Sequence, residues 1–180
     1  MRITGGEYRG RTILCPPGII RPSMDRMRTS LYSILGDLEG CSFLDLFSGS
    51  GILGIEAASR GAAPVVLVEK DYRKKATLLR NISFVHSDIQ LVLAPVERFL
   101  RSDQRSWDVI FLDPPFDAEG KGLVLDAACE PPHLAEGGIA IIHLHRAEKL
   151  ETERPGLVLA DRREYGQSLL LFFEPRKQSA

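Results

Sequence analysis

The sequence has few of the features that would tie it to an oxidising compartment or to a membrane. Its 180 residues include only three cysteines, and no two of them form a Cys-x-x-Cys pair. Such a sparse, odd number is typical of free thiols in a reducing compartment. No apolar run approaches the roughly 20 residues that a membrane helix needs, and the first residues lack the apolar segment of a secretory signal. We therefore expect a cytoplasmic protein with no membrane partner.

The chain also lacks a strong net charge, internal repeats and low-complexity tracts. Its net charge is −1, so overall charge gives no indication of a nucleic-acid partner. Apolar residues make up 44% of the chain and charged residues 26%, which is an ordinary globular balance. This length and composition predict one domain with a full hydrophobic core and at most a small appendage.

From residue 42 onward, apolar strands alternate with helical segments. The expected strands are 42–47, 64–69, 89–93, 107–112, 139–144, 157–163 and 168–173. The expected helices are 24–35, 52–59, 72–82, 96–101 and 119–129. This alternation predicts an α/β fold whose mostly parallel, seven-stranded sheet carries helices on both faces, after an N-terminal β-hairpin or arm and one helix. Ligands of such open sheets bind beyond the carboxyl ends of the strands.

A glycine-rich loop follows the first expected strand. The run from Asp45 to Gly54 reads Asp-Leu-Phe-Ser-Gly-Ser-Gly-Ile-Leu-Gly and contains G-x-G-x-x-G. Glycines let the backbone turn tightly and approach a ligand, and the next helix offers free N–H groups. Glu69 ends the following strand, 20 residues beyond Gly49, where its carboxylate can accept hydrogen bonds from two ribose hydroxyls. The pattern predicts an adenosine-type ligand, with a purely structural turn as the alternative.

The glycine motif alone fits both NAD and S-adenosylmethionine. Asp45 favours the second, because a carboxylate before the loop attracts a cationic methionine moiety and repels a pyrophosphate. The alternative is that Asp45 only braces the loop. The expected cofactor-binding residues are Asp45, Phe47, Ser48, Gly49, Ser50, Gly51, Glu69, Lys70 and Val96. No metal is expected, because His143 and His145 have no matching cluster of further ligands nearby.

The strand over 107–112 ends in Asp113-Pro114-Pro115-Phe116, the four residues that we predict to be catalytic. Two prolines fix φ and supply no N–H, so their carbonyls can be held rigidly toward a ligand. Phe116 can stack on a base, and Asp113 can accept a hydrogen bond from an exocyclic amine. Acceptors that hold such an amine favour a tetrahedral nitrogen and stabilise its developing positive charge. The alternative is a proline-rich turn with Phe116 in the core.

These and further motifs resemble those of a known family. The matching stretches are 1–11, 21–28, 44–54, 56–62, 68–71, 113–116 and 165–166. They resemble the bacterial methyltransferases that modify guanine N2 in small-subunit (16S) ribosomal RNA. The resemblance implies a Rossmann-like class I methyltransferase fold, S-adenosylmethionine as donor and a flipped-out guanine as acceptor. Pro95 departs from the family, which usually has Asp or Asn there to contact the adenine amine, so this contact is left to the Val96 N–H and apolar packing.

The first residues carry an arginine-rich segment that suits an RNA partner. Residues 1–28 hold six arginines against only Glu7 and Asp25. We interpret residues 1–36 as an RNA-binding arm and helix and residues 37–180 as the methyltransferase domain, in one unit. The expected RNA-binding residues are Arg9, Arg11, Arg21, Arg26 and Arg28. Two of them, Arg26 and Arg28, cannot both face one phosphate from a helix, and a merely solvated face is the alternative for the whole set.

Several functions are compatible with these patterns. The leading hypothesis is methylation of guanine N2 in small-subunit ribosomal RNA, free or in an assembling subunit, by a monomer. An amino-methyltransferase for another RNA or DNA base is the first alternative. An NAD(P)-dependent oxidoreductase is less favoured, because no Tyr-x-x-x-Lys pair or similar hydride-transfer partner is evident. A non-catalytic RNA-binding module is disfavoured by the intact Asp-Pro-Pro-Phe.

Overall fold

The computed structural model describes residues 1–16 and 24–177. Its helices are α1 (Met24–Leu35), α2 (Ile52–Ser59), α3 (Lys75–Ile82), α4 (Val96–Ser102) and α5 (Lys121–Cys129), with a 3-10 turn η1 (Tyr72–Lys74). Its strands are β1 (Phe43–Leu46), β2 (Val65–Glu69), β3 (Ile89–Leu93), β4 (Trp107–Leu112), β5 (Leu134–His145), β6 (Leu157–Tyr165) and β7 (Ser168–Pro175). Among these described residues, no helix is both long and apolar enough to cross a bilayer.

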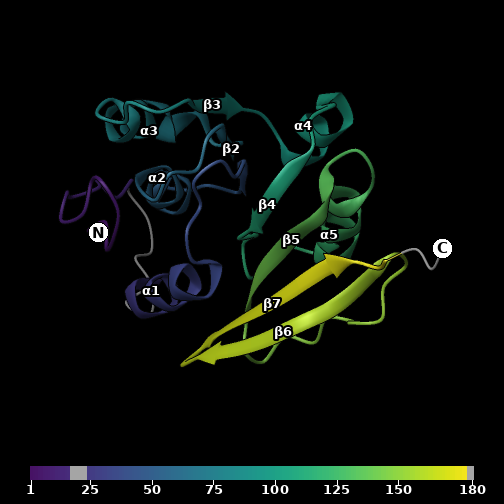
Figure 1. The fold of residues 1–180 in the computed structure, drawn as a ribbon. Coiled ribbons are helices and arrows are strands. Elements are labelled where there is room, and N and C mark those ends of the chain that lie inside the picture. The colour runs from purple at the N-terminus through teal and green to yellow at the C-terminus, as the bar shows by residue number, and fades with distance from the viewer. Residues whose placement is uncertain (17–23, 178–180) are drawn as a thin grey trace.

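The seven strands form one sheet in the order β3-β2-β1-β4-β5-β7-β6. Neighbours from β3 to β5 pair in parallel, whereas β7 runs antiparallel to both β5 and β6 at the far edge (Figure 1). Because β1 to β5 run the same way, the segments that follow them meet at one edge of the sheet. This confirms the predicted mostly parallel, seven-stranded α/β fold.

Helices cover both faces of the sheet, because its central strands are apolar on both sides. One core cluster includes Met27 of α1, Ile55 of α2 and Leu78 of α3. The other includes Phe99 of α4 and Leu125 of α5. Figure 1 shows α4 and α5 on the opposite side of the sheet from α1, α2 and α3. The predicted placement of helices on both faces is confirmed.

Several element boundaries differ from the prediction by one or two residues, and two differences are larger. β5 begins at Leu134 rather than at 139, because Leu134 already pairs with Trp107; the register then shifts at a bulge, and Val109 pairs with Ile139. The expected helix over 72–82 is divided into η1 and α3, since the Asp71 side chain accepts from the Arg73 N–H and starts a separate 3-10 turn.

Residues 1–16, here called the N-terminal segment, are packed onto the domain rather than extended from it. Its predicted hairpin is present but short: Arg2 pairs with Thr12 in an antiparallel bridge, the Ile3 N–H donates to the Arg11 carbonyl at 3.0 Å, and the Ile13 N–H donates to the Met1 carbonyl at 2.7 Å. Ile3, Tyr8 and Ile13 are buried in the same core cluster as α1 and α2. Apolar burial of this kind drives docking of the segment, so α2 is enclosed between the sheet and the N-terminal residues, and all eight of its residues are buried.

Candidate functional site

Three acidic side chains project from neighbouring strands toward one face of the sheet. Asp45 lies on β1, Glu69 ends β2, and Asp113 follows β4. The residues two positions before them all belong to one core cluster, namely Phe43, Leu67 and Phe111. Because side chains alternate along a strand, the three carboxylates point to the same face. The strand order β2-β1-β4 brings them together at the carboxyl edge of the sheet.

The glycine-rich loop between β1 and α2 turns sharply over this edge. Gly49 and Gly51 have φ values of 58° and 78°, and Phe47 has the same left-handed backbone at 66°. A side chain at such a φ is strained, and strain of this kind is concentrated at functional loops. A Cβ at Gly54 would lie 2.2 Å from Leu67 Cδ2. The third glycine of the motif therefore permits close packing of α2 on β2.

Glu69 connects this loop with the segment after β2. Its Oε2 accepts from the Gly49 N–H at 3.0 Å and from Lys74 Nζ at 2.9 Å, and its Oε1 accepts from the Asp71 N–H at 2.9 Å. Glu69 as a whole is only 5% exposed. Each carboxylate oxygen can accept more than one hydrogen bond, so this arrangement fits the ribose contact that the sequence predicts.

Asp45 both braces the loop and keeps one oxygen without a partner. Its Oδ2 accepts from the Gly54 N–H at 3.0 Å, whereas Oδ1 is buried with no hydrogen bond among the described residues. Burial raises the pKa of Asp45 to about 8, and the negative charges of Asp113 and Glu69 act in the same direction against the Gly54 hydrogen bond. A buried carboxylate oxygen without a donor fits a cationic ligand group such as the methionine amine.

The other predicted cofactor residues surround these groups at different depths. Ser48 and Ser50 are buried in the loop, Lys70 is exposed beside Glu69, and Val96 is buried at the start of α4. Ser48 donates its backbone N–H to the Val68 carbonyl at 3.0 Å, which holds the loop against β2. The carboxylate acceptors of Asp45 and Glu69, together with the glycine-rich loop, fit an adenosine-containing ligand with a cationic tail.

Asp113 lies beside the glycine loop, and Phe116 lies against two histidines of β5. The Asp113 N–H donates to the Leu46 carbonyl at 3.2 Å, directly before the loop begins. The ring of Phe116 is partly exposed and meets the rings of His143 and His145 edge-on, at 5.6 and 5.4 Å between centroids. These observations disfavour the alternative in which Phe116 is a core residue.

The two prolines between them differ in environment. Pro114 is buried, and Pro115 is exposed. The Pro115 carbonyl accepts the Ala118 N–H at 3.0 Å. The expectation that both proline carbonyls point toward a ligand is therefore corrected for Pro115, because its carbonyl closes a turn.

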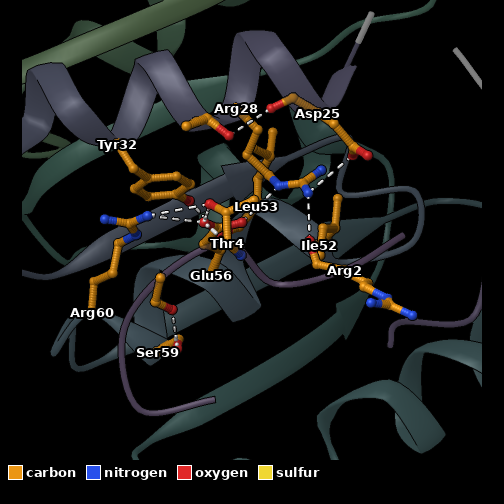
Figure 2. A network of polar contacts seen from close by, with 12 residues as sticks. Arg2, Thr4, Asp25, Arg28, Tyr32, Ile52, Leu53, Glu56, Ser59 and Arg60 are labelled. Atoms are coloured by element: carbon orange, nitrogen blue, oxygen red, sulfur yellow. Dashed lines mark hydrogen bonds and ion pairs between the residues drawn. The ribbon is translucent and has the colours of Figure 1, made fainter. Parts of the chain in front are cut away.

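The predicted RNA-binding arginines do not share one environment. Arg9, Arg11 and Arg26 are exposed, and Arg21 lies outside the described residues. Arg28 has no exposed surface, and its Nε lies 2.6 Å from Glu56 Oε2. Its prediction as an RNA-binding residue is therefore corrected, because a guanidinium buried against a carboxylate is inaccessible to a phosphate (Figure 2).

Glu56 is the centre of the polar network in Figure 2. Besides Arg28, it accepts from the Thr4 N–H at 3.2 Å, from the Thr4 hydroxyl and from Arg60 Nη2 at 3.1 Å. From the sequence alone, Glu56 can either support the glycine-rich loop or lie on an exposed face of the helix. The structure shows a third arrangement, in which one buried carboxylate of α2 holds both the N-terminal segment and α1.

Sequence reasoning missed Asn81 and Lys121 as residues of the site, and it weighed His143 only as a metal ligand or as a strand-end histidine beside the pocket. Asn81 is 3% exposed and donates through Nδ2 to the carbonyls of Ser50 and Leu14, both at 2.9 Å, which joins the loop to the N-terminal segment. Lys121 donates from Nζ to the Phe116 carbonyl at 2.7 Å and also contacts Glu148. His143 contacts Asp113 through Nδ1 at 2.8 Å. The sequence pointed to the contact between Asp113 and His143 only through the order of two consecutive expected strands, 107–112 and 139–144.

A family model and several known proteins match this chain, and the family model covers nearly all of it. The family model described as Conserved hypothetical protein 95 matches residues 1–174. Ribosomal RNA small subunit methyltransferase D of Escherichia coli (strain K12) is 37% identical over 120 residues, which cover 64% of this chain and 60% of that protein. The protein of the same name from Haemophilus influenzae is 28% identical over 170 residues, covering 90% of this chain and 88% of the relative.

Solved structures of similar proteins share the architecture. A hypothetical protein of Thermus thermophilus superposes with a TM-score of 0.83 at 31% identity, over 97% of this chain and 99% of that one. Matches of this extent confirm the Rossmann-like class I methyltransferase fold that the resemblance implies.

Proposed function

The chain belongs to the Conserved hypothetical protein 95 family, and from this we propose that it transfers a methyl group from S-adenosylmethionine to guanine N2 in small-subunit (16S) ribosomal RNA. One observation carries the proposal. Asp113 follows β4, the parallel neighbour of β1, and its N–H donates to Leu46 at the start of the glycine loop. A predicted amine-binding group and a predicted cofactor loop therefore lie side by side.

The cofactor end of the site is assigned to three groups. Glu69 holds the ribose hydroxyls, Asp45 offers its buried Oδ1 to the methionine amine, and the loop glycines allow the backbone close to the ligand. When bound, S-adenosylmethionine supplies a methyl group whose carbon–sulfur bond breaks as the new bond to the amine nitrogen forms. The raised pKa of Asp45 means that a cation at Oδ1 favours release of its proton.

The acceptor end prepares a weak nucleophile. The lone pair of an exocyclic amine is delocalised into the base, so the nitrogen attacks only when its geometry becomes more tetrahedral. Asp113 accepts an N–H bond of the amine and stabilises its developing positive charge. Phe116 stacks on the flipped base and fixes its plane, which supplies the alignment on which the rate depends. The ammonium that forms is strongly acidic and releases its proton to Asp113 or to water.

The N-terminal segment and α1 supply the RNA contacts in this proposal. Residues 1–36 form the RNA-binding part, and residues 37–180 form the methyltransferase domain. Arg9, Arg11 and Arg26 are exposed and available to phosphates. Ribosomal RNA as the substrate is supported by the names of the relatives from Escherichia coli and Haemophilus influenzae. The proposal places the reaction in the cytoplasm.

The test uses the purified chain with labelled S-adenosylmethionine. Small subunits and protein-free 16S RNA are prepared from a strain without the corresponding enzyme, incubated separately, and digested to nucleosides. We expect label in N2-methylguanosine only, and none with Asp113→Ala, which should still bind S-adenosylhomocysteine in calorimetry. Label in a methylated adenosine or cytidine would overturn the guanine assignment. Preferential binding of NAD would overturn the methyltransferase assignment.

A further inference from the structure

His143 lies against the predicted amine-binding group from the next strand of the sheet. β4 and β5 pair in parallel with Leu112 opposite Ile142, so the residues that follow, Asp113 and His143, are also side by side. His143 Nδ1 lies 2.8 Å from Asp113 Oδ1. The imidazole has no exposed surface, whereas the Asp113 side chain is 19% exposed. A buried group thus holds a group that reaches the surface of the site.

The direction of this hydrogen bond follows from its partners. A carboxylate only accepts, so the hydrogen lies on Nδ1 of the imidazole and is donated to Asp113. His143 Nε2 is buried and has no hydrogen-bond partner among residues 1–16 and 24–177. A proton passed to the ring would have no exit from Nε2. The geometry therefore suits a fixed donor rather than a proton relay.

The ring of His143 is itself held in place. It meets the partly exposed Phe116 ring edge-on, with the ring planes at 70°, and β5 is flanked by β4 and β7. One imidazole therefore contacts both the residue that accepts the amine and the residue that stacks on the base. A rigid donor at this position fixes the plane of the Asp113 carboxylate relative to Phe116.

We propose that His143 is a positioning residue, which holds the Asp113 carboxylate in the orientation that amine methylation requires; this inference rests on the function proposed above. In the reaction, the new nitrogen–carbon bond forms as the carbon–sulfur bond breaks, and the ammonium loses its proton to Asp113 or water. His143 takes no part in that transfer and keeps its hydrogen on Nδ1 throughout.

Two substitutions of nearly equal shape separate a positioning role from a packing role. His143→Asn keeps a donor near the position of Nδ1, whereas His143→Leu has the same branched shape and no donor. We expect His143→Leu to lower kcat about 100-fold, because small misplacements of reacting groups have effects of that size. The KM for RNA and the Kd for S-adenosylhomocysteine should change by less than about twofold, since neither ligand touches the imidazole in this assignment. His143→Asn should recover at least about tenfold of the lost kcat.

The measurements are steady-state methylation of small-subunit RNA, calorimetric binding of S-adenosylhomocysteine and thermal unfolding of each variant. Unchanged kcat in a folded His143→Leu chain would overturn the inference, as would folded Leu and Asn variants of equal activity. If the Leu variant does not fold, nitrogen-15 NMR of the unsubstituted chain decides: hydrogen on Nδ1 supports the proposal, and hydrogen on Nε2 overturns it. No N2-methylguanosine from the unsubstituted chain would overturn the proposed function first, and this inference with it.

Discussion

Arg28 and Glu56 form an ion pair in which neither side chain has any exposed surface, with 2.6 Å between Nε and Oε2. Arg28 also donates to the Arg2 carbonyl at 2.6 Å and contacts Asp25 at 3.0 Å. The pair therefore joins α2, which begins directly after the glycine loop, to α1 and to the N-terminal segment. Removing one partner of such a pair leaves an uncompensated charge in a low-dielectric environment.

We predict that Glu56→Gln lowers the free energy of unfolding by about 3 kcal/mol. The substitution keeps the shape of the side chain and removes the charge that compensates Arg28 and Arg60. Chemical denaturation measures the effect. The matched control is Glu164→Gln, which breaks an exposed pair with Arg162 at 2.7 Å and should change stability by no more than about 1 kcal/mol. Equal effects of the two substitutions would contradict this account.

Local patterns were sufficient to predict the glycine-rich loop, the strands and the position of Glu69 at the end of β2, because each depends on residues close in sequence. Arg28 could not be assigned in this way. The apolar spacing over 24–35 predicts a buried helix face of Met27, Leu31, Ile34 and Leu35. In the structure Ile34 is 40% exposed, whereas Arg28 and Tyr32 are buried. An arginine is buried only if a partner compensates its charge, and that partner is a carboxylate 28 residues away in sequence.

The pH dependence of stability should report on Asp45. Its pKa is raised from 3.8 to about 8 by burial, so between about pH 4 and pH 8 the folded chain holds a proton that the unfolded chain has released. This contribution to stability is fully present below about pH 4 and is lost as the pH rises toward 8. Asp45→Asn cannot ionise, so its melting temperature without cofactor should fall less between pH 5 and pH 8. Parallel pH profiles for the two chains would contradict the raised pKa.

Gly54 should tolerate a methyl group poorly. A Cβ there would lie 2.2 Å from Leu67 Cδ2 and 3.1 Å from Val65 Cγ1, so Gly54→Ala forces α2 and β2 apart. We expect a loss of about 1–3 kcal/mol in the free energy of unfolding, as for other overpacked sites. In the double variant, Leu67→Ala removes the closest obstacle. The loss should therefore be smaller than the sum of the two single losses, and strict additivity would show that the contact is not the cause.

Lys121 should matter for the acceptor and not for the cofactor. Its Nζ donates to the Phe116 carbonyl at 2.7 Å, and the Lys121 side chain is only 8% exposed. Lys121→Met should lower kcat/KM for RNA about tenfold, the effect of losing one charge-assisted hydrogen bond. Binding of S-adenosylhomocysteine should stay unchanged in calorimetry. Lys149→Met, at an exposed position, is the control. A comparable loss of kcat/KM in that variant would show that the contact with Phe116 is not the cause.

The exposed arginines of the N-terminal segment and α1 should set the salt dependence of RNA binding. Arg9→Gln and Arg26→Gln each remove one exposed charge, so affinity should fall, and the slope of log affinity against log salt should decrease by about 0.7–0.9 for each phosphate that the variant no longer neutralises. Arg98→Gln makes the same charge change on α4, across the sheet from α1. The slope should then stay at the value for the unsubstituted chain. An arginine contributes to the salt slope only where it neutralises an RNA phosphate and displaces counterions. If Arg98→Gln reduced the slope as much as Arg9→Gln, the overall charge of the protein, and not the N-terminal segment, would govern RNA binding.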